Sequence, residues 1–182
     1  MIRWHQAAAL LTILLPEAPT PAIGQAVPFS QHATVSQRVL VTDILVEYNR
    51  PVARGRKLFG PGALVPPGRV WNPGADSASR IVFSRDVEVE GHALPAGRYS
   101  LWLQPSATGP WTLILNRAVD VYHTPYPGDA TEALRTTVVP EEGGPIEALA
   151  FYFPIVAADS AILRMHWGTT IVPIRIRAPA RE

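Results

Sequence analysis

Hydrophobic and polar residues alternate along most of the chain beyond residue 27, with the two-residue period that is typical of β-strands. The clearest case runs from Arg98 to Asn116, where two alternating segments flank the turn Thr108-Gly109-Pro110 and predict a β-hairpin. No segment in this part of the chain shows a convincing helical period. The other strands that we expect cover residues 34–41, 43–48, 80–83, 86–89, 134–139, 146–156, 161–167 and 171–177.

Short strands at this spacing, separated by turns, are typical of antiparallel sandwiches. The 13 glycines and 19 prolines are spread between the apolar segments and do not form one low-complexity tract. The pattern therefore predicts an all-β fold, an antiparallel β-sandwich of jelly-roll or Greek-key type with roughly nine to eleven strands. Residues 27–182 are expected to form a single domain without substantial helix.

The pattern also predicts which tryptophans are buried and where an acidic turn lies. Trp102 alternates against the apolar residues of its strand, which favours an exposed side chain suited to binding. Trp111 and Trp167 lie in well-patterned strands and are expected in the core. The segment from Pro140 to Pro145, rich in acids and glycine, is expected to be a solvated turn.

Residues 1–26 have the features of a secretory signal peptide. Residues 7–15 are apolar except for Thr12, and this run is too short to span a membrane as a helix. Gly24 and Ala26 provide small residues before a cleavage site, so cleavage is expected after Ala26. The alternative is a buried N-terminal helix. The mature chain is expected to be periplasmic or extracellular.

A long loop, residues 52–70, follows the second expected strand and has no clear period. The residues that make it a candidate site are Arg50, Arg54, Arg56, Arg69 and Trp71. Guanidinium groups beside an indole can hold a carboxylate, a phosphate or a sulfated sugar. Alternatively, Arg50 and Arg56 bind acids or loop carbonyls and fix the loop to the sheet, because its backbone groups need partners.

Composition narrows the classes of function. The formal net charge is +1, which gives no indication of a nucleic-acid partner or of a polybasic membrane surface. Of the 16 basic residues only Lys57 is a lysine, and arginine forks suit carboxylate or phosphate. The absence of cysteine excludes disulfides, thiolate metal sites and a cysteine nucleophile.

Catalytic patterns are sparse. No G-x-S-x-G motif is present, and the histidines lack the spacing of metal ligands on one element, so neither a metal nor a cofactor is expected. His123, in the irregular loop 117–130, is a candidate general base if that loop folds over a site. Glu47, Asp76 and Asp86 are the carboxylates near the long loop.

Several short motifs follow one another in a characteristic order along the chain. They are Tyr48-x-Arg50-Pro51, Gly55-Arg56-x-x-Phe59-Gly60, Leu64-Val65-Pro66, Val70-Trp71, Gly74-Ala75, Val89-x-Gly91, Leu94-Pro95-Ala96-Gly97-x-Tyr99-Ser100-Leu101, Trp111-x-x-Ile114-Leu115-Asn116 and Trp167. In this order and spacing the chain resembles the bacterial exported domain-of-unknown-function family numbered 2911, over essentially all of its length beyond the leader. The resemblance implies a secreted or periplasmic β-sandwich and implies no established activity.

The chain departs from the family pattern just after Trp71. Family members typically read Trp-Arg-Thr-Gly-Ala-Asn-Glu-Ala-Thr, whereas here Asn72 replaces the arginine, Asp76 the amide and Ser77 the acid. If the family binds an anion there, this chain has lost one guanidinium and gained a carboxylate. Residues 72–79 are therefore where its binding is expected to differ.

These observations favour an exported β-sandwich of unknown activity that binds a small molecule, a carbohydrate or an anion, or is associated with the cell envelope. The candidate ligand-binding residues are Tyr48, Arg50, Arg54, Arg56, Trp71, Asp76 and His123. The alternative is a small-molecule hydrolase or isomerase with its site under residues 52–75, and a third reading is an envelope protein without a ligand. An enzyme should bring His123 or Asp76 within about 3 Å of another polar side chain in a closed pocket.

Overall fold

The structure is a computed structural model that describes residues 30–179, so the expected signal peptide lies outside the described residues. Within them it contains ten strands and one 3₁₀ turn, Asp129–Thr131. The strands are β1 (Gln31–Val39), β2 (Thr42–Arg50), β3 (Arg80–Phe83), β4 (Val87–Val89), β5 (His92–Leu94), β6 (Gly97–Gln104), β7 (Trp111–Asn116), β8 (Glu132–Val138), β9 (Glu141–Val156) and β10 (Ser160–Arg177). The prediction of an all-β fold is confirmed.

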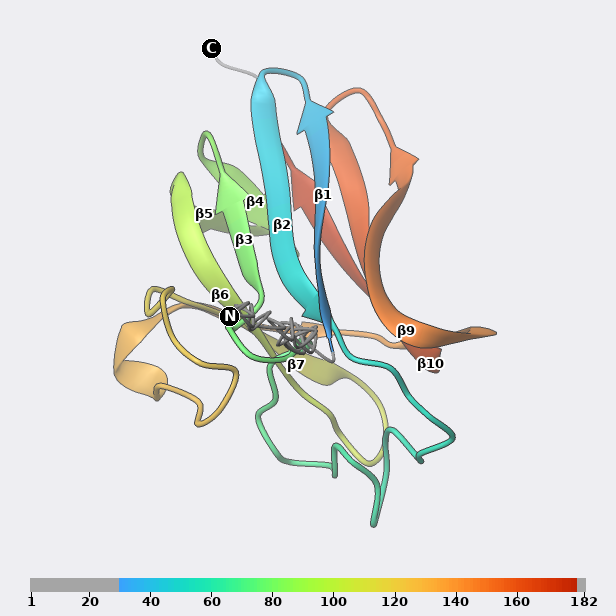
Figure 1. Cartoon of the computed structure of the whole chain (residues 1–182). Coiled ribbons are helices and arrows are strands. Elements are labelled where there is room, and N and C mark those ends of the chain that lie inside the picture. Colours follow the sequence, from blue (N-terminus) through green and yellow to red (C-terminus); the bar gives the residue numbers. More distant parts are fainter. Residues whose placement is uncertain (1–29, 180–182) are drawn as a thin grey trace, which may run out of the picture.

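The strands form two sheets that pack against each other as an antiparallel sandwich (Figure 1). The six-stranded sheet has the order β1-β2-β3-β6-β7-β8, and the four-stranded sheet has the order β5-β4-β10-β9. In the view of Figure 1 the β1–β2 turn lies at the top, whereas the long segment between β2 and β3 hangs below the sheets. Within residues 30–179, no helix has the length and apolar character needed to cross a bilayer.

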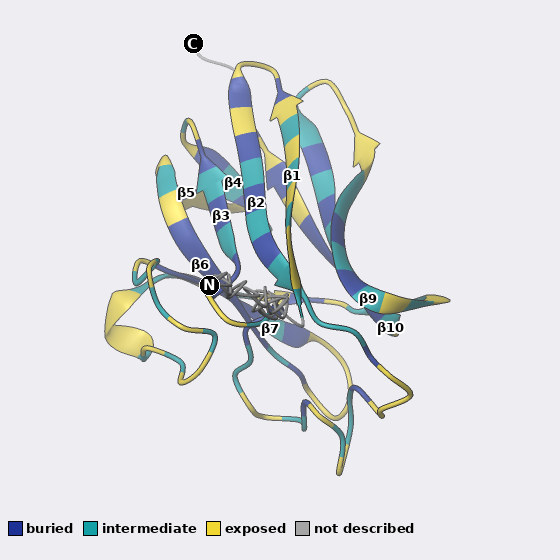
Figure 2. Cartoon of the chain, in the orientation of Figure 1, coloured by how far each residue is buried: buried dark blue, intermediate teal, exposed yellow. Residues whose placement is uncertain are grey.

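The core lies between the sheets because each strand presents apolar side chains to one face. In β2 the inward residues Ile44, Val46 and Tyr48 are buried, and the residues between them are more exposed, as the banding in Figure 2 shows. The register pairs Ile44 with Phe83 and Val46 with Ile81, so neighbouring strands bury the same face. Since the side-chain period is two, a slip of one residue would turn this apolar set toward solvent.

The expected turn at residues 140–145 is wrong, because β9 already begins at Glu141 and pairs there with Ile171. Of the two glycines in this segment, Gly143 serves close packing instead of a turn. A Cβ on Gly143 would overlap the Ile171 side chain, so only glycine lets the two strands approach this closely. The β9–β10 hairpin is therefore longer than the sequence pattern indicated.

The expected exposure of Trp102 is also wrong, since its side chain is only 1% exposed. It lies on the outer face of the six-stranded sheet in a second apolar cluster with Ala78 and Ile114. Tyr126, from the loop between β7 and β8, packs edge-on against it with ring centroids 5.1 Å apart. Loops that are distant in sequence cover Trp102. Its side chain is therefore buried although it lies on the face of the strand opposite the main core.

The segment between β2 and β3, residues 51–79, has little regular structure but is joined to the sandwich at intervals. Val52 pairs with Ala148 of β9, and Trp71 pairs with Leu103 of β6 through two backbone hydrogen bonds of 2.8 Å. Further along, Ser77 pairs with Tyr122. The segment is thus fixed to both sheets and to the other long loop.

Candidate functional site

A cleft of about 490 Å³ lies between residues 53–59 and the middle of the β9–β10 hairpin. We call it the loop cleft. Its volume falls in the range of small-molecule sites, about 300–1,000 Å³. The residues that line it include the polar side chains of Arg56, Glu147, Thr169 and Thr170 and the apolar side chains of Leu58, Phe59, Ile146 and Trp167.

One wall of the loop cleft is held in place by backbone hydrogen bonds between the loop and β9. The Leu149 amide donates to the Pro51 carbonyl at 2.9 Å, and the Ala53 amide donates to the Glu147 carbonyl at 2.8 Å. The Arg54 amide donates to the Glu147 carboxylate at 2.5 Å. These bonds continue the edge of β9 into the loop, which explains how a segment without regular structure keeps a fixed position.

Two of the predicted arginines bind carbonyl groups of the protein. Arg50 Nε donates to the Leu149 carbonyl at 2.9 Å. Arg56 Nε and Nη2 donate to the carbonyls of Ala53 and Val52, at 2.9 and 2.7 Å. Both side chains therefore fix the loop, as the structural interpretation of these arginines expected. Only Arg56 also lines the loop cleft.

An aromatic cluster forms the base of the loop cleft. Phe59 lies 5.6 Å from Trp71, 5.1 Å from Trp111 and 6.2 Å from Trp167, measured between ring centroids. Trp71 stacks on Trp167 at 5.8 Å with an interplanar angle of 12°. Trp71 thus lies behind Phe59 as part of the core and does not line the loop cleft.

A glycine sets the shape of the opposite wall. Gly168 has φ 60°, and a Cβ there would lie 2.8 Å from Leu58 Cδ1. A larger residue would be strained in the left-handed region and would displace Leu58. Gly168 therefore allows the loop and β10 to pack closely beside the polar residues Thr169 and Thr170.

The structure does not bring the predicted site residues together at one place. Tyr48 is in the core, where its hydroxyl accepts a hydrogen bond from the Phe151 amide at 3.1 Å. Arg54 is exposed next to the loop cleft. Asp76 and His123 belong to a different region, where the Asp76 carbonyl contacts the His123 amide at 2.8 Å and Nδ1 at 2.9 Å. The polar contact of His123 is thus to the main chain.

The segment that departs from the family pattern is largely internal. Asn72 is fully buried, its Nδ2 donates to the Leu101 carbonyl at 2.8 Å, and its Oδ1 accepts from the Ser79 amide at 2.9 Å. The side chain therefore links residues 72–79 to β6. Asp76 and Ser77 are the exposed members of this segment.

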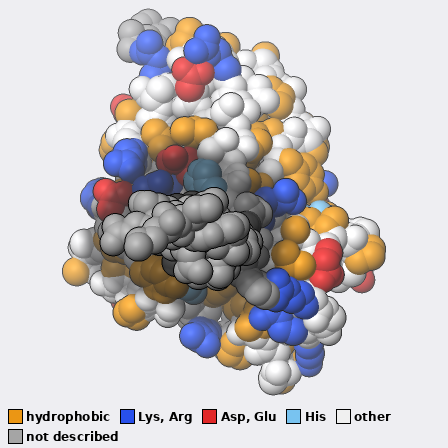
Figure 3. Space-filling view, viewed as in Figure 1, with side chains coloured by type: hydrophobic (Ala, Val, Ile, Leu, Met, Phe, Trp, Pro, Cys, Tyr) orange, Lys and Arg blue, Asp and Glu red, His pale blue; other side chains and the backbone are white. Residues whose placement is uncertain are grey.

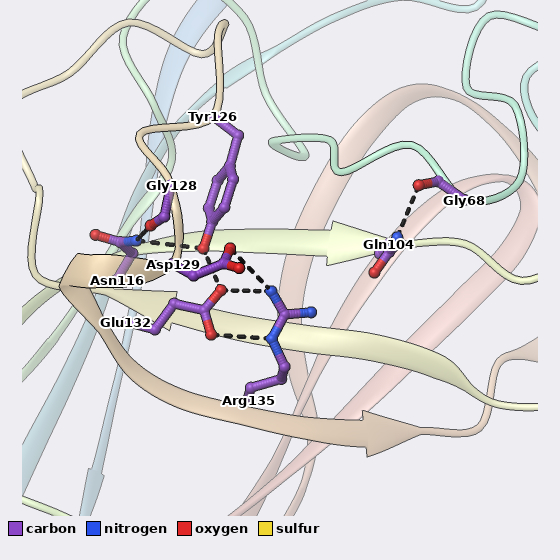
Figure 4. A network of polar contacts seen from close by, with 8 residues as sticks. All are labelled: Gly68, Gln104, Asn116, Tyr126, Gly128, Asp129, Glu132 and Arg135. Atoms are coloured by element: carbon purple, nitrogen blue, oxygen red, sulfur yellow. Dashed lines mark hydrogen bonds and ion pairs between the residues drawn. The ribbon is translucent and has the colours of Figure 1, made fainter.

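The loop between β7 and β8, residues 117–131, is fixed by side chains from its own end of the sheet (Figure 4). The Tyr126 hydroxyl donates to Glu132, and Arg135 donates to the same carboxylate through Nε at 2.9 Å and Nη2 at 2.5 Å. Asn116 Nδ2 donates to the Gly128 carbonyl at 3.0 Å. This closed network, with Glu132 at its centre, fixes Tyr126 over Trp102.

The ionisation of this network follows from its contacts. Burial, together with the hydrogen bond to Glu132, raises the pKa of Tyr126 to about 12. The Arg135 guanidinium lowers the pKa of the Glu132 carboxyl below its usual value. Tyr126 therefore remains a hydrogen-bond donor and Glu132 an acceptor over a wide pH range, which suits a structural role.

Of the polar residues that line the loop cleft, Arg56 is a candidate in the sequence analysis, whereas Glu147, Thr169 and Thr170 are not. These three residues lie in strands of ordinary composition, and only the break at Gly168-Thr169 marks a place where β10 departs from a regular pattern. Among residues 30–179, no group of three histidine or acidic side chains is arranged to hold a metal ion.

Comparison with known proteins relates the whole sandwich to one family. The family model described as a protein of unknown function, DUF2911, matches residues 30–176. No curated protein and no solved structure matches the chain. The match covers every strand apart from the last residue of β10. The chain therefore belongs to the DUF2911 family, as the motifs between Tyr48 and Trp167 indicated.

Proposed function

We propose that this chain is a binding module for a small hydroxylated organic anion, which occupies the loop cleft. The observation that carries the proposal is the convergence of Arg56, Glu147 and two threonines above an aromatic base in a cleft of about 490 Å³. Small-molecule sites typically combine apolar walls with a few polar groups that fix orientation. The loop cleft has this composition.

Arg56 provides the cationic group. Nε and Nη2 bind loop carbonyls, whereas Nη1 makes no hydrogen bond within residues 30–179. A guanidinium that is already oriented by two hydrogen bonds loses little freedom when it binds a ligand oxygen. A ligand carboxylate is the natural partner, because charge-assisted hydrogen bonds are roughly twice as strong as neutral ones.

Hydroxyl groups on the ligand would match the remaining polar side chains. Glu147 is a carboxylate with one oxygen bound to the Arg54 amide, so its second oxygen is suited to accept from a hydroxyl. Thr169 and Thr170 can both donate and accept. The combination favours a hydroxy acid or a uronic sugar over a simple inorganic anion.

The proposal is tested by a thermal-shift screen of the purified protein against hydroxy acids, uronic acids and their neutral analogues, followed by calorimetry of any compound that binds. The Thr169→Val variant should weaken binding about tenfold, which corresponds to the loss of one well-placed hydrogen bond. Thr137→Val is the matched control, since Thr137 is an exposed threonine on β8 away from the cleft. The proposal is overturned if no acid raises Tm, or if Thr169→Val and Thr137→Val bind equally.

We also propose that the chain acts outside the cytoplasm. The support is the short apolar run at residues 7–15 and the small residues Gly24 and Ala26. N-terminal sequencing of the protein recovered from an expressing bacterium should then begin at Val27. Recovery of a chain that still begins at Met1 would contradict the proposal.

A further inference from the structure

A second pocket, of about 230 Å³, lies on the outer face of the six-stranded sheet and is separate from the loop cleft. We call it the outer pocket. Its polar lining comes from β1, β2, β3 and the segment before β3: His32, Glu47, Asn49, Ser77 and Arg80. Figure 3 shows acidic, basic and histidine side chains gathered on this face beside the atoms drawn in grey.

The strand register places these side chains next to one another. His32 is paired with Asn49 across β1 and β2, and Glu47 is paired with Arg80 across β2 and β3. Residues directly opposite each other in an antiparallel pair project to the same face of the sheet. The outer pocket is therefore built on rigid strands, which is the favourable support for a binding site.

Glu47 is the central acceptor of the outer pocket. Its side chain is 26% exposed, and it forms an ion pair with Arg80 Nε at 3.4 Å. The carboxylate accepts no hydrogen bond from residues 30–179, and Arg80 Nε is buried without a hydrogen-bond partner there. Half-buried charges without hydrogen bonds are costly, so a ligand hydroxyl that donates to Glu47 would be favoured.

The electrostatic balance argues against a charged ligand. Arg80 Nη1 lies 3.1 Å from Asp120, and Arg98 lies 3.4 Å from the same carboxylate. With Glu47, the pocket and its rim hold two acids and two arginines, so their charges cancel. A neutral ligand with several hydroxyl groups suits such a set of donors and acceptors.

An exposed aromatic residue is paired with one of the residues that line the outer pocket. Tyr122 is 56% exposed and forms an isolated antiparallel bridge with Ser77, which lines the pocket. Paired residues of a bridge project to the same side, so the Tyr122 side chain is expected on the side of Ser77. The centroid of its ring lies 4.4 Å from that of the neighbouring His123. An aromatic face beside polar groups offers an apolar surface to the C–H side of a sugar ring.

We propose that the outer pocket binds a short neutral carbohydrate, with Glu47 and Arg80 contacting ring hydroxyls and Tyr122 stacking on a sugar face. The site would give the chain a second ligand class, different from the anion proposed for the loop cleft. It also gives a function to Ser77, one of the exposed positions at which the chain departs from its family's pattern.

The test is calorimetric titration of the purified protein with neutral disaccharides (maltose, cellobiose and chitobiose) and with galacturonate as a charged comparison. At least one neutral disaccharide should bind, and Tyr122→Ala should weaken that binding about tenfold. Glu47→Gln, which keeps the shape of the side chain, should also weaken it. Val139→Ala is the matched control, because Val139 is a similarly exposed apolar side chain that directly follows β8, at the edge of the sheet opposite β1.

Tyr122→Ala removes an exposed side chain and should leave the Tm of the protein unchanged, so lost binding cannot be attributed to unfolding. Thr169→Val, in the loop cleft, should leave carbohydrate binding intact. The proposal is overturned if no neutral disaccharide binds, if Tyr122→Ala binds as well as Val139→Ala, or if Thr169→Val weakens the binding instead.

Discussion

Residues 51–60 and residues 117–131 are two irregular segments that the structure fixes in opposite ways. The first is held mainly by main-chain acceptors, with Arg50 and Arg56 donating to carbonyl groups. The second is held by a closed side-chain network around Glu132 and an aromatic contact on Trp102. The first segment therefore borders the loop cleft, whose surface carries polar groups. In the second segment the polar side chains form hydrogen bonds and ion pairs with one another.

This difference teaches which irregular segment is suited to binding. A network whose donors and acceptors are all paired gains little from a ligand, whereas a loop fixed through its backbone leaves side-chain donors available. The number of charged residues does not separate the two segments. What separates them is the kind of partner: the charged groups around Glu132 pair with one another, whereas Arg56 binds main-chain carbonyls through Nε and Nη2, and its Nη1 makes no hydrogen bond within residues 30–179.

The largest expected effect comes from removing Trp102, the buried side chain against which the second segment packs. Trp102→Ala should lower the free energy of unfolding by about 3–5 kcal/mol, because it empties a fully buried site under residues 117–131. Urea denaturation measures this loss. Leu64→Ala, at a 43% exposed position, is the control and should change stability by less than about 0.5 kcal/mol. A loss for Trp102→Ala as small as that of the control would contradict the assigned packing.

A smaller effect tests the backbone fastening of the first segment. Arg50→Ala should cost about 1.5–3 kcal/mol, because it removes a charge-assisted hydrogen bond to the Leu149 carbonyl. Hydrogen exchange at the amides of Ala53 and Leu149 should accelerate in the variant. Arg69→Ala is the matched control, since Arg69 is an exposed arginine further along the connection between β2 and β3. Equal effects of the two substitutions would contradict the assigned role of Arg50 in fixing the loop to β9.

The acid dependence of the second segment gives a still smaller effect. The folded-state pKa of Glu132 is lowered by Arg135, so its contribution to stability is complete above the unfolded pKa of about 4.3 and is lost as pH falls through the folded pKa. Arg135→Gln should remove up to about 1 kcal/mol at neutral pH and flatten the decline in stability below pH of about 4.3. Unfolding curves at several pH values, compared with Arg69→Gln, measure this change. An unaltered pH profile would show that Glu132 is not held by this pair.

The smallest expected effect concerns His123. Its ring contacts the Asp76 carbonyl and an exposed tyrosine, so His123→Ala should cost less than about 1 kcal/mol. Binding of an anion in the loop cleft should be unchanged, because His123 belongs to the other region. Calorimetry of the variant decides this. Loss of anion binding in this variant would indicate that the loop cleft and residues 117–131 act as one site, which would contradict the contrast drawn between the two segments.

The strands of the six-stranded sheet and their core residues could be predicted from the sequence, because the alternation of apolar and polar residues indicates which face of a strand is buried. It worked for β2, where Ile44, Val46 and Tyr48 point inward. It failed for Trp102, since burial on the outer face depends on a loop that returns from elsewhere in the chain. The pattern also failed to predict the start of β9 at Glu141, because Gly143, which is needed for close packing, resembles a turn residue in the sequence.

The candidate site could be predicted only in part. Arg56 stood out because it occurs in a loop rich in arginine, and the structure places it in the loop cleft. Glu147 lies beside it because residues 51–53 pair with β9, and Thr169 because β10 pairs with β9. No local sequence pattern predicts the first of these pairings. The outer pocket depends in the same way on register, which fixes Glu47 beside Arg80.

The pairing of residues 51–53 with β9 has a consequence for the order of folding. The bonds from the Ala53 and Leu149 amides close one wall of the loop cleft with β9, which is synthesised long after the loop. Contacts so distant in sequence form late, because the intervening chain must first be ordered. A fragment that stops before Glu141 would keep every arginine of the loop and have no cleft at all, so ligand binding would report that β9 and β10 have been made and folded.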